Sequence, residues 1–311
     1  MSKKSAKSKK GKRKSSGGVG NKIRILLVIL LMLTGLGVLL YPTISNMWNE
    51  YLHFKAIGNY EEVVQDLPDE KKINLLEEAR KYNKQHTVNT IMDAFGDENQ
   101  YVLTHPYDTM LAVDDTGMMC YLEIPKLKEK MVVFHGISAK VLEKGVGHIE
   151  GTSLPVGGES THTVMSAHRG LPSAKLFTDL DKMLVGDQFY IHVLDEHLAY
   201  EVDQINVVLP QEVSLLDIVQ GEDLATLVTC TPYGVNTHRM LVRGHRVPYV
   251  PPEEPTETFW EKMSELKFAI ITLLVALLIA DIVFIVFRLK RRKKKRDDRN
   301  EDHEQKNIVG S

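Results

Sequence analysis

From Met118 onward the chain consists of short apolar runs separated by Gly, Pro and Asp, and this spacing constrains the fold more than any other feature. The runs are rich in Val, Ile, Leu, Tyr and Thr, and most of these residues favour strands. The candidate strands are residues 118–124, 131–135, 162–168, 187–194, 198–209, 225–230 and 239–246. Several short strands with turns between them are typical of a mainly β barrel or sandwich.

Charge is distributed unevenly, although the formal net charge is only −2. Residues 1–24 carry ten Lys or Arg and no acidic residue, and residues 288–299 carry nine Lys or Arg against two Asp. Two apolar segments, 23–41 and 267–287, lie next to these basic ends. Each segment approaches the ~20 apolar residues needed to cross a bilayer. The positive-inside rule then places both termini in the cytoplasm and the region between the segments outside the cell membrane.

These patterns divide the chain into eight regions. They are a basic cytoplasmic tail (1–22), a transmembrane helix (23–41), an N-terminal helical region (42–88), a long loop (89–108), the β domain (109–248), a Pro-rich linker (249–266), a second transmembrane helix (267–287) and a basic cytoplasmic tail (288–311). A cleaved signal peptide is the alternative for residues 23–41, but no convincing small-residue cleavage site follows that segment. Within the helical region, one face carries Ile73, Leu76, Ala79 and Tyr82.

Three side chains with useful chemistry fall at the ends of predicted strands. The run 226–230 ends in Cys230 before a Pro-Gly turn, and the chain returns as a second strand that begins with Arg239. Another run ends in His168, just before a glycine turn. A thiol, an imidazole and a guanidinium at strand ends predict acyl transfer through a covalent thioester.

Each of these residues also has a plainer interpretation. The only other cysteine is Cys120, and an exported domain of this size could pair it with Cys230 in a disulfide. His168 could be a histidine of the core. Arg239 could form a surface ion pair, and Arg243 competes with it for the catalytic position because residues four apart on a strand share one face.

Several function classes lack support in the sequence. It contains no nucleotide-binding glycine motif, no CxxC and no HExxH, so we predict no cofactor and no metal site. The basic tails adjoin apolar segments, so they are explained as determinants of topology, and we predict no nucleic-acid partner.

Taken together, these residues make the chain similar to the class C sortases, the pilus-assembling transpeptidases of Gram-positive bacteria. Residues 226–230 (TLVTC) resemble the sortase signature TLxTC, and residues 231–244 extend it in the class C form. His168-Arg169-Gly170 resembles the histidine motif of the family, and residues 145–158 resemble the stretch ahead of it. The resemblance covers most of residues 40–290 and implies a closed sortase-type β-barrel of about eight strands with short helices.

The resemblance also implies a mechanism. Cys230 corresponds to the nucleophile, His168 to the acid/base and Arg239 to the cation that stabilises the oxyanion. The substrate would be a pilin with an LPxTG-like sorting signal, which is joined to a lysine amine of another pilin without a cofactor. The alternatives are a sortase that anchors proteins to the cell wall through a peptidoglycan amine, and a non-catalytic membrane scaffold with a degenerate barrel.

Class C sortases typically carry a lid with an Asp-Pro-aromatic motif in the active-site groove. The corresponding residues here are Asp93-Ala94-Phe95, so we expect Asp93 to pair with Arg239 and Phe95 to lie near Cys230. Ala in place of Pro restricts the backbone less and predicts a more mobile lid. A second candidate for the motif that anchors the lid is His105-Pro106-Tyr107, on the same loop. Cys120, where the family often has Gly, is interpreted as a core cysteine.

Overall fold

The structure is a computed structural model that describes residues 17–85 and 107–251, together with residues 273, 277, 284, 288 and 291. The chain divides into two units, residues 1–251 and 252–311. Most of the predicted lid loop, most of the linker and most of the second apolar segment lie outside the described residues.

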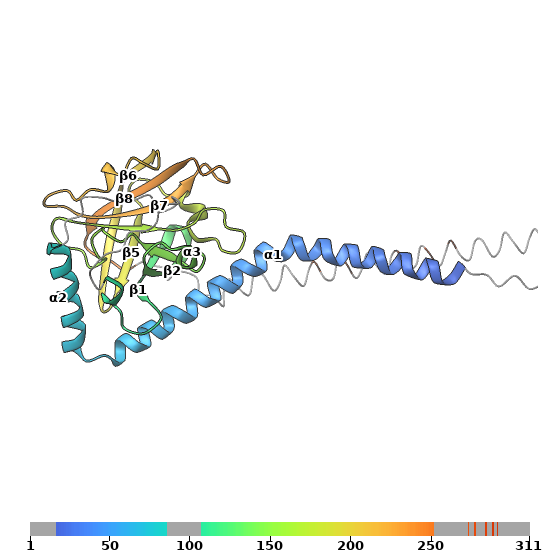
Figure 1. Ribbon diagram of the computed structural model, residues 1–311, viewed down its shortest axis with the longest axis horizontal. Helices are drawn as coiled ribbons and strands as arrows, with labels where there is room; N and C mark the ends of the chain where they lie inside the picture. The colour runs from blue at the N-terminus through green and yellow to red at the C-terminus, as the bar shows by residue number, and fades with distance from the viewer. Residues whose placement is uncertain are drawn as a thin grey trace, which may run out of the picture. The chain divides into compact units, whose positions relative to one another are not determined.

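Eight strands form a closed barrel, as the resemblance implies. They are β1 (Met118–Ile124), β2 (Glu129–His135), β3 (Val146–His148), β4 (Thr161–Ser166), β5 (Gln188–Val193), β6 (Glu196–Val208), β7 (Asp223–Thr231) and β8 (His238–Val247). Their order around the barrel is β1-β2-β3-β4-β7-β8-β6-β5. The strand predictions match seven of them within a few residues, and β3 is the one that they miss. The mainly β prediction is therefore confirmed (Figure 1).

Three α-helices and four short 3₁₀ segments complete the described secondary structure. These elements are α1 (Gly17–Asp66), α2 (Asp69–Gln85), α3 (Ala139–Leu142), η1 (Tyr107–Thr109), η2 (Pro125–Leu127), η3 (Leu176–Lys182) and η4 (Ser214–Leu216). Among the residues described, none of the helices combines the length and the apolar character required to span a lipid bilayer.

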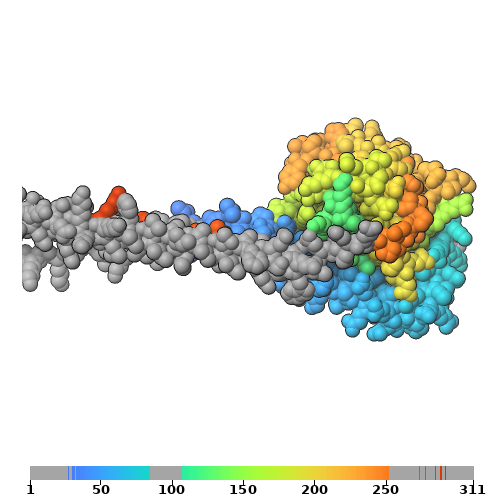
Figure 2. Space-filling model, turned by 180° about the vertical axis from the view of Figure 1, so that it is seen from behind, coloured from blue at the N-terminus to red at the C-terminus, as the bar shows by residue number. Residues whose placement is uncertain are grey.

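Helix α1 is fastened to the barrel by buried polar contacts. The Tyr60 hydroxyl donates to the carbonyl of Met119 at 3.2 Å and accepts from the N–H of Leu194 at 2.8 Å. His53 Nδ1 accepts from the N–H of Val132 at 3.3 Å. The C-terminal half of α1 therefore lies against β1 and β2, where Figure 2 shows it in lighter blue below the barrel.

The same helix also contacts the loop that precedes η3. Ser45 Oγ donates to the carbonyl oxygen of Ser173 at 2.9 Å, and Asn49 Nδ2 donates to the same oxygen. One backbone carbonyl of that loop is thus held by two side chains of α1.

The buried face of α2 differs at one residue from the face predicted from the sequence. Leu76, Ala79 and Tyr82 are buried as expected, but Ile73 is 55% exposed. The buried position is taken instead by the stem of Lys72, whose ammonium group reaches Asp195 at 2.8 Å. A long aliphatic stem that ends in a paired charge covers apolar surface as a hydrophobic residue would.

In the barrel, β7 lies between β4 and β8. β7 runs parallel to β4, with Ser166 opposite Val228, and antiparallel to β8. The hydrophobic core contains large side chains such as Phe177, Phe189 and Tyr200, all of which are fully buried. The ends of β4, β7 and β8 are therefore carried on a rigid, close-packed scaffold.

Candidate active site

Cys230 and Arg239 lie directly opposite each other on neighbouring strands. They are Cα partners in the antiparallel pairing of β7 with β8. Both are buried, with exposed fractions of 6% and 7%. Opposed residues of an antiparallel pair point to the same face of the sheet, so the thiol and the guanidinium share one side of the barrel wall.

His168 reaches the same level from the other side of β7. Beyond the last paired residues of β4, the N–H of Ala167 donates to the carbonyl of Val228 at 3.2 Å. The hydroxyl of Thr229 donates to the carbonyl of Ala167 at 2.8 Å. His168 and Cys230 each follow next in sequence, so the parallel register carries the imidazole and the thiol to the same end of adjacent strands.

The surroundings of His168 favour its neutral form. The side chain is about half-buried, and this burial lowers the pKa of the imidazole, while the negative charge of Glu143 acts in the opposite direction. A neutral imidazole can accept a proton, which is the first requirement for a general base.

The alternative of a disulfide between the two cysteines is wrong, because Cys120 and Cys230 are both reduced thiols. Cys120 lies on β1, is fully buried, and burial raises the pKa of its thiol well above the usual range. It is therefore a core cysteine, as its sequence position suggests, and it is a poor nucleophile because the thiolate is the reactive form.

Arg243 is engaged elsewhere. Its Nε and Nη2 donate to the two carboxylate oxygens of Asp203 at 3.0 Å and 2.6 Å. Arg239, in contrast, donates through Nη1 to the carbonyls of Asn236 and His238, both at 3.2 Å. The bidentate ion pair fixes Arg243 to Asp203 of β6, whereas Arg239 is the arginine that lies opposite Cys230 in the strand register.

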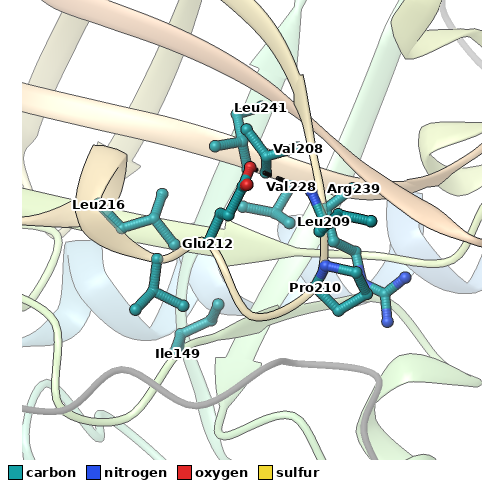
Figure 3. Close-up of a pocket in the computed structure, with 10 residues that line it drawn as sticks. Ile149, Val208, Leu209, Pro210, Glu212, Leu216, Val228, Arg239 and Leu241 are labelled. Atoms are coloured by element: carbon teal, nitrogen blue, oxygen red, sulfur yellow. Dashed lines mark hydrogen bonds between the residues drawn. The ribbon is translucent and has the colours of Figure 1, made fainter.

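An apolar pocket borders Arg239 (Figure 3). It holds about 20 Å³, and its lining consists of Ile149, Val208, Leu209, Pro210, Glu212, Val213, Leu216, Val228, Arg239 and Leu241. The guanidinium lies beside Pro210 at the edge, and a Glu212 oxygen accepts from the N–H of Leu209 at 3.3 Å. Leu209 is 47% exposed, so part of this apolar surface faces solvent.

The end of the predicted lid loop joins the barrel at Tyr107, which is buried. Its hydroxyl lies 2.8 Å from His148 Nδ1 and accepts from the N–H of Gly136 at 3.1 Å. Tyr107 is thus fixed to the barrel, and a role of the second candidate motif in anchoring a lid stays a prediction. Asp93 and Phe95 lie outside the described residues, and their contacts with Arg239 and Cys230 stay predictions.

Metal-binding chemistry has no obvious place in the part of the chain that the structure describes, where no cluster of three or more His, Cys, Asp or Glu side chains could hold a metal ion.

Comparison with known proteins identifies the family. Residues 122–247 match the sortase domain. A crystal structure of sortase C1 from Streptococcus agalactiae is 46% identical, with a TM-score of 0.58, and the match covers 63% of this chain and 100% of that one. Sortase C from Streptococcus pneumoniae is 44% identical, with a TM-score of 0.58, over 64% of this chain and 99% of that one. The chain belongs to the class C sortases.

More distant sortases match a smaller part. Sortase D from Bacillus subtilis (strain 168) is 29% identical over 129 residues, which is 40% of this chain and 62% of that protein. The chain thus covers less than two thirds of this curated relative. Sortases are cysteine transpeptidases, and family membership assigns this chain to that type of enzyme.

Proposed function

We propose that this sortase transfers an acyl group through a thioester on Cys230, with His168 as acid/base and Arg239 as the oxyanion-stabilising cation. The observation that carries the proposal is the arrangement of three adjacent strands. Cys230 lies directly opposite Arg239, and His168 follows the strand on the other side at the same level.

The first half-reaction forms the thioester. His168 first removes the proton of the Cys230 thiol, and the resulting thiolate attacks the carbonyl carbon at the scissile peptide bond. The Arg239 guanidinium stabilises the oxyanion. The C–N bond then breaks, and His168 delivers a proton to the departing amine. In the second half-reaction an amine attacks the thioester carbonyl, His168 removes its proton, and Cys230 leaves as the thiolate.

The substrate class follows from the family. A pilin with an LPxTG-like sorting signal presents an extended segment with Leu and Pro ahead of the scissile bond. Such a segment would lie over exposed apolar surface such as that of Leu209, because the pocket beside Arg239, at about 20 Å³, holds no more than about one water molecule. A solved relative at 44% identity is described as giving insight into pilin substrate specificity, which supports a pilin as the substrate.

The proposed cellular arrangement rests on the sequence. Residues 23–41 and 267–287 span the membrane, with the barrel outside and both termini in the cytoplasm, because the basic residues flank the pair of apolar segments. The loop 89–108 covers the site as a lid, with Asp93 directed to Arg239 and Phe95 to Cys230. The anchored Tyr107 supports a lid that remains attached to the barrel when it opens.

The test is direct detection of the thioester. The purified chain is incubated with an LPxTG-type peptide, and an adduct on Cys230 is sought by mass spectrometry. We expect an adduct in the wild type that increases in Phe95→Ala and is absent from Cys230→Ala, while Cys120→Ala retains it. A reduced, reactive Cys230 that forms no adduct in either the wild type or Phe95→Ala would refute the proposal and favour the scaffold.

The acceptor is identified by competition. A lysine-containing pilin peptide and a peptidoglycan-type amine are added together to the acylated enzyme. Preferential formation of the lysine isopeptide supports pilus assembly, and preferential transfer to the peptidoglycan amine supports anchoring to the cell wall.

A further inference from the structure

One guanidinium connects the loop that follows His168 with the residue that follows Cys230. Arg169 Nη1 donates to the hydroxyl of Thr231 at 3.1 Å, and its Nε donates to the carbonyl of Thr178 at 3.3 Å. Its Nη2 donates to Asp181 Oδ2 at 2.5 Å. The Arg169 side chain is only 8% exposed, so these contacts lie largely out of solvent.

These contacts are made where the backbone ladder has ended. The last backbone bond at this end runs from the N–H of Ala167 to the carbonyl of Val228, and the Thr229 hydroxyl adds a bond to the carbonyl of Ala167. Beyond that point His168 belongs to the loop after β4, whereas Cys230 stays on β7, which pairs with β8 as far as Thr231. Arg169 replaces the missing ladder with a side-chain bridge.

A second, independent contact joins the loop after His168 to the turn after β7. Gly170 has a φ of +76°, and a Cβ placed on it would lie 2.7 Å from the Tyr233 ring. The ring of Tyr233, which belongs to the turn after β7, therefore covers the backbone immediately after Arg169. In addition, the N–H of Gly170 donates to the Thr178 hydroxyl at 3.0 Å, which fixes the loop to η3.

We propose that Arg169 is a positioning residue that sets the separation between the His168 imidazole and the Cys230 thiol by bridging the loop after His168 to the end of β7 through Thr231. The inference deepens the proposed function and rests on it. A planar guanidinium can bind three acceptors in different directions at once, which a lysine ammonium on a flexible stem does less well. A small displacement of a catalytic group costs up to about a hundredfold in rate, so such a bridge has a direct kinetic effect.

A purely structural role makes a different prediction. The carboxylate of Asp181 is 42% exposed, and an ion pair with an exposed partner adds little to stability. If Arg169 served folding alone, its loss would lower the yield of folded protein, and the molecules that do fold would react as the wild type does.

The experiment uses the purified full-length chain and two variants of the bridge. Arg169→Met removes the donors, and Thr231→Val removes the acceptor while keeping the shape of the side chain. Thr231→Ser restores a hydroxyl. The matched control is Arg80→Met. Arg80 also donates to a carboxylate, that of Glu196, at 2.5 Å, but it lies on α2 and makes no part of the bridge.

Two quantities are measured for each variant. The first is the rate of peptide acylation, separated into kcat and KM. The second is the rate of Cys230 alkylation by iodoacetamide as a function of pH, with Cys230→Ala as the blank and His168→Ala as the reference for a thiol without its imidazole.

We expect Arg169→Met to lower kcat by about tenfold to a hundredfold with KM changed by no more than about twofold. Thr231→Val lowers kcat in the same way, and Thr231→Ser recovers it. The double variant, Arg169→Met with Thr231→Val, has a kcat no lower than that of Arg169→Met, because both changes break the same bridge. The alkylation profile of both single variants moves toward that of His168→Ala. Arg80→Met retains the wild-type kcat and profile.

The proposal is overturned if the alkylation profiles of Arg169→Met and Thr231→Val superimpose on the wild type, or if His168→Ala itself leaves that profile unchanged. Failure of the proposed function has a different signature. No peptide adduct then forms in the wild type, although the alkylation profile still responds to Arg169→Met.

Discussion

Two buried histidines make the stability of this protein sensitive to acid. Burial lowers the pKa of both His53 and His148 to about 4. His148 stays neutral because it is fully buried, although the bond from its Nε2 to the carbonyl of Ser153 at 2.9 Å acts in the opposite direction. In the unfolded chain both histidines titrate near the ordinary value of about 6.5.

The sign and size follow from proton linkage. Between pH 6.5 and 4 the unfolded chain binds more protons than the folded one, so the free energy of unfolding falls as the pH falls through this window. At pH 5 each histidine contributes a loss of about 2 kcal/mol relative to pH 8, and the pair about 4 kcal/mol. That is a large part of the ~5–15 kcal/mol that stabilises a typical domain.

A single variant isolates this effect. The Asn oxygen in His53→Asn can accept the N–H of Val132, as His53 Nδ1 does, but the amide does not titrate. The free energy of unfolding is measured by urea denaturation at pH 8 and pH 5 in the wild type and the variant. We expect the loss between the two values to be about 2 kcal/mol smaller in His53→Asn. An equal loss in both proteins would refute the argument, because carboxylate titrations common to both cancel in the comparison.

Three substitutions test other contacts. Gly147→Ala places a Cβ 2.3 Å from the carbonyl oxygen of Gly136, and we expect urea denaturation to detect at least about 2 kcal/mol of lost stability. Tyr107→Phe leaves the N–H of Gly136 and Nδ1 of His148 without the hydroxyl, at a cost of about 2 kcal/mol in the same assay; an unchanged midpoint would contradict it. Arg243→Met breaks the ion pair with β6 and lowers stability by about 1 kcal/mol or less, while acylation stays within about twofold. A loss of acylation as large as that of an Arg239 variant would instead make Arg243 the oxyanion cation.

Much of the barrel is predictable from local pattern, because most of its strands are longer than five residues and are bounded by Gly or Pro. β3 escapes prediction because it spans only Val146–His148 and contains a glycine. The order of the strands is not visible locally. The parallel pairing of β4 with β7 joins residues about 60 positions apart, such as Thr161 and Asp223, and only the closed barrel requires it.

The candidate active site, like the barrel, is predictable from the sequence only in part. A strand, a turn and a return strand predict that Cys230 and Arg239 are neighbours, and the register confirms it. The engagement of Arg243 by Asp203 depends on β6, which is paired to β8 from a distant part of the sequence, so spacing alone leaves both arginines open. Sequence reasoning gives Arg169 no role beyond its place in a motif, because its partners come from η3 and the end of β7.

The contact of Ser45 and Asn49 with the carbonyl of Ser173 has a practical consequence for truncated forms of the enzyme. Ser173 lies five residues after His168, and both of these donors lie on α1 within eight residues of the end of the first apolar segment, 23–41. A fragment that begins after residue 49 leaves that carbonyl without both donors, whereas one that begins before residue 45 keeps them. Rates from fragments with different starting residues are therefore comparable only when each includes this part of α1.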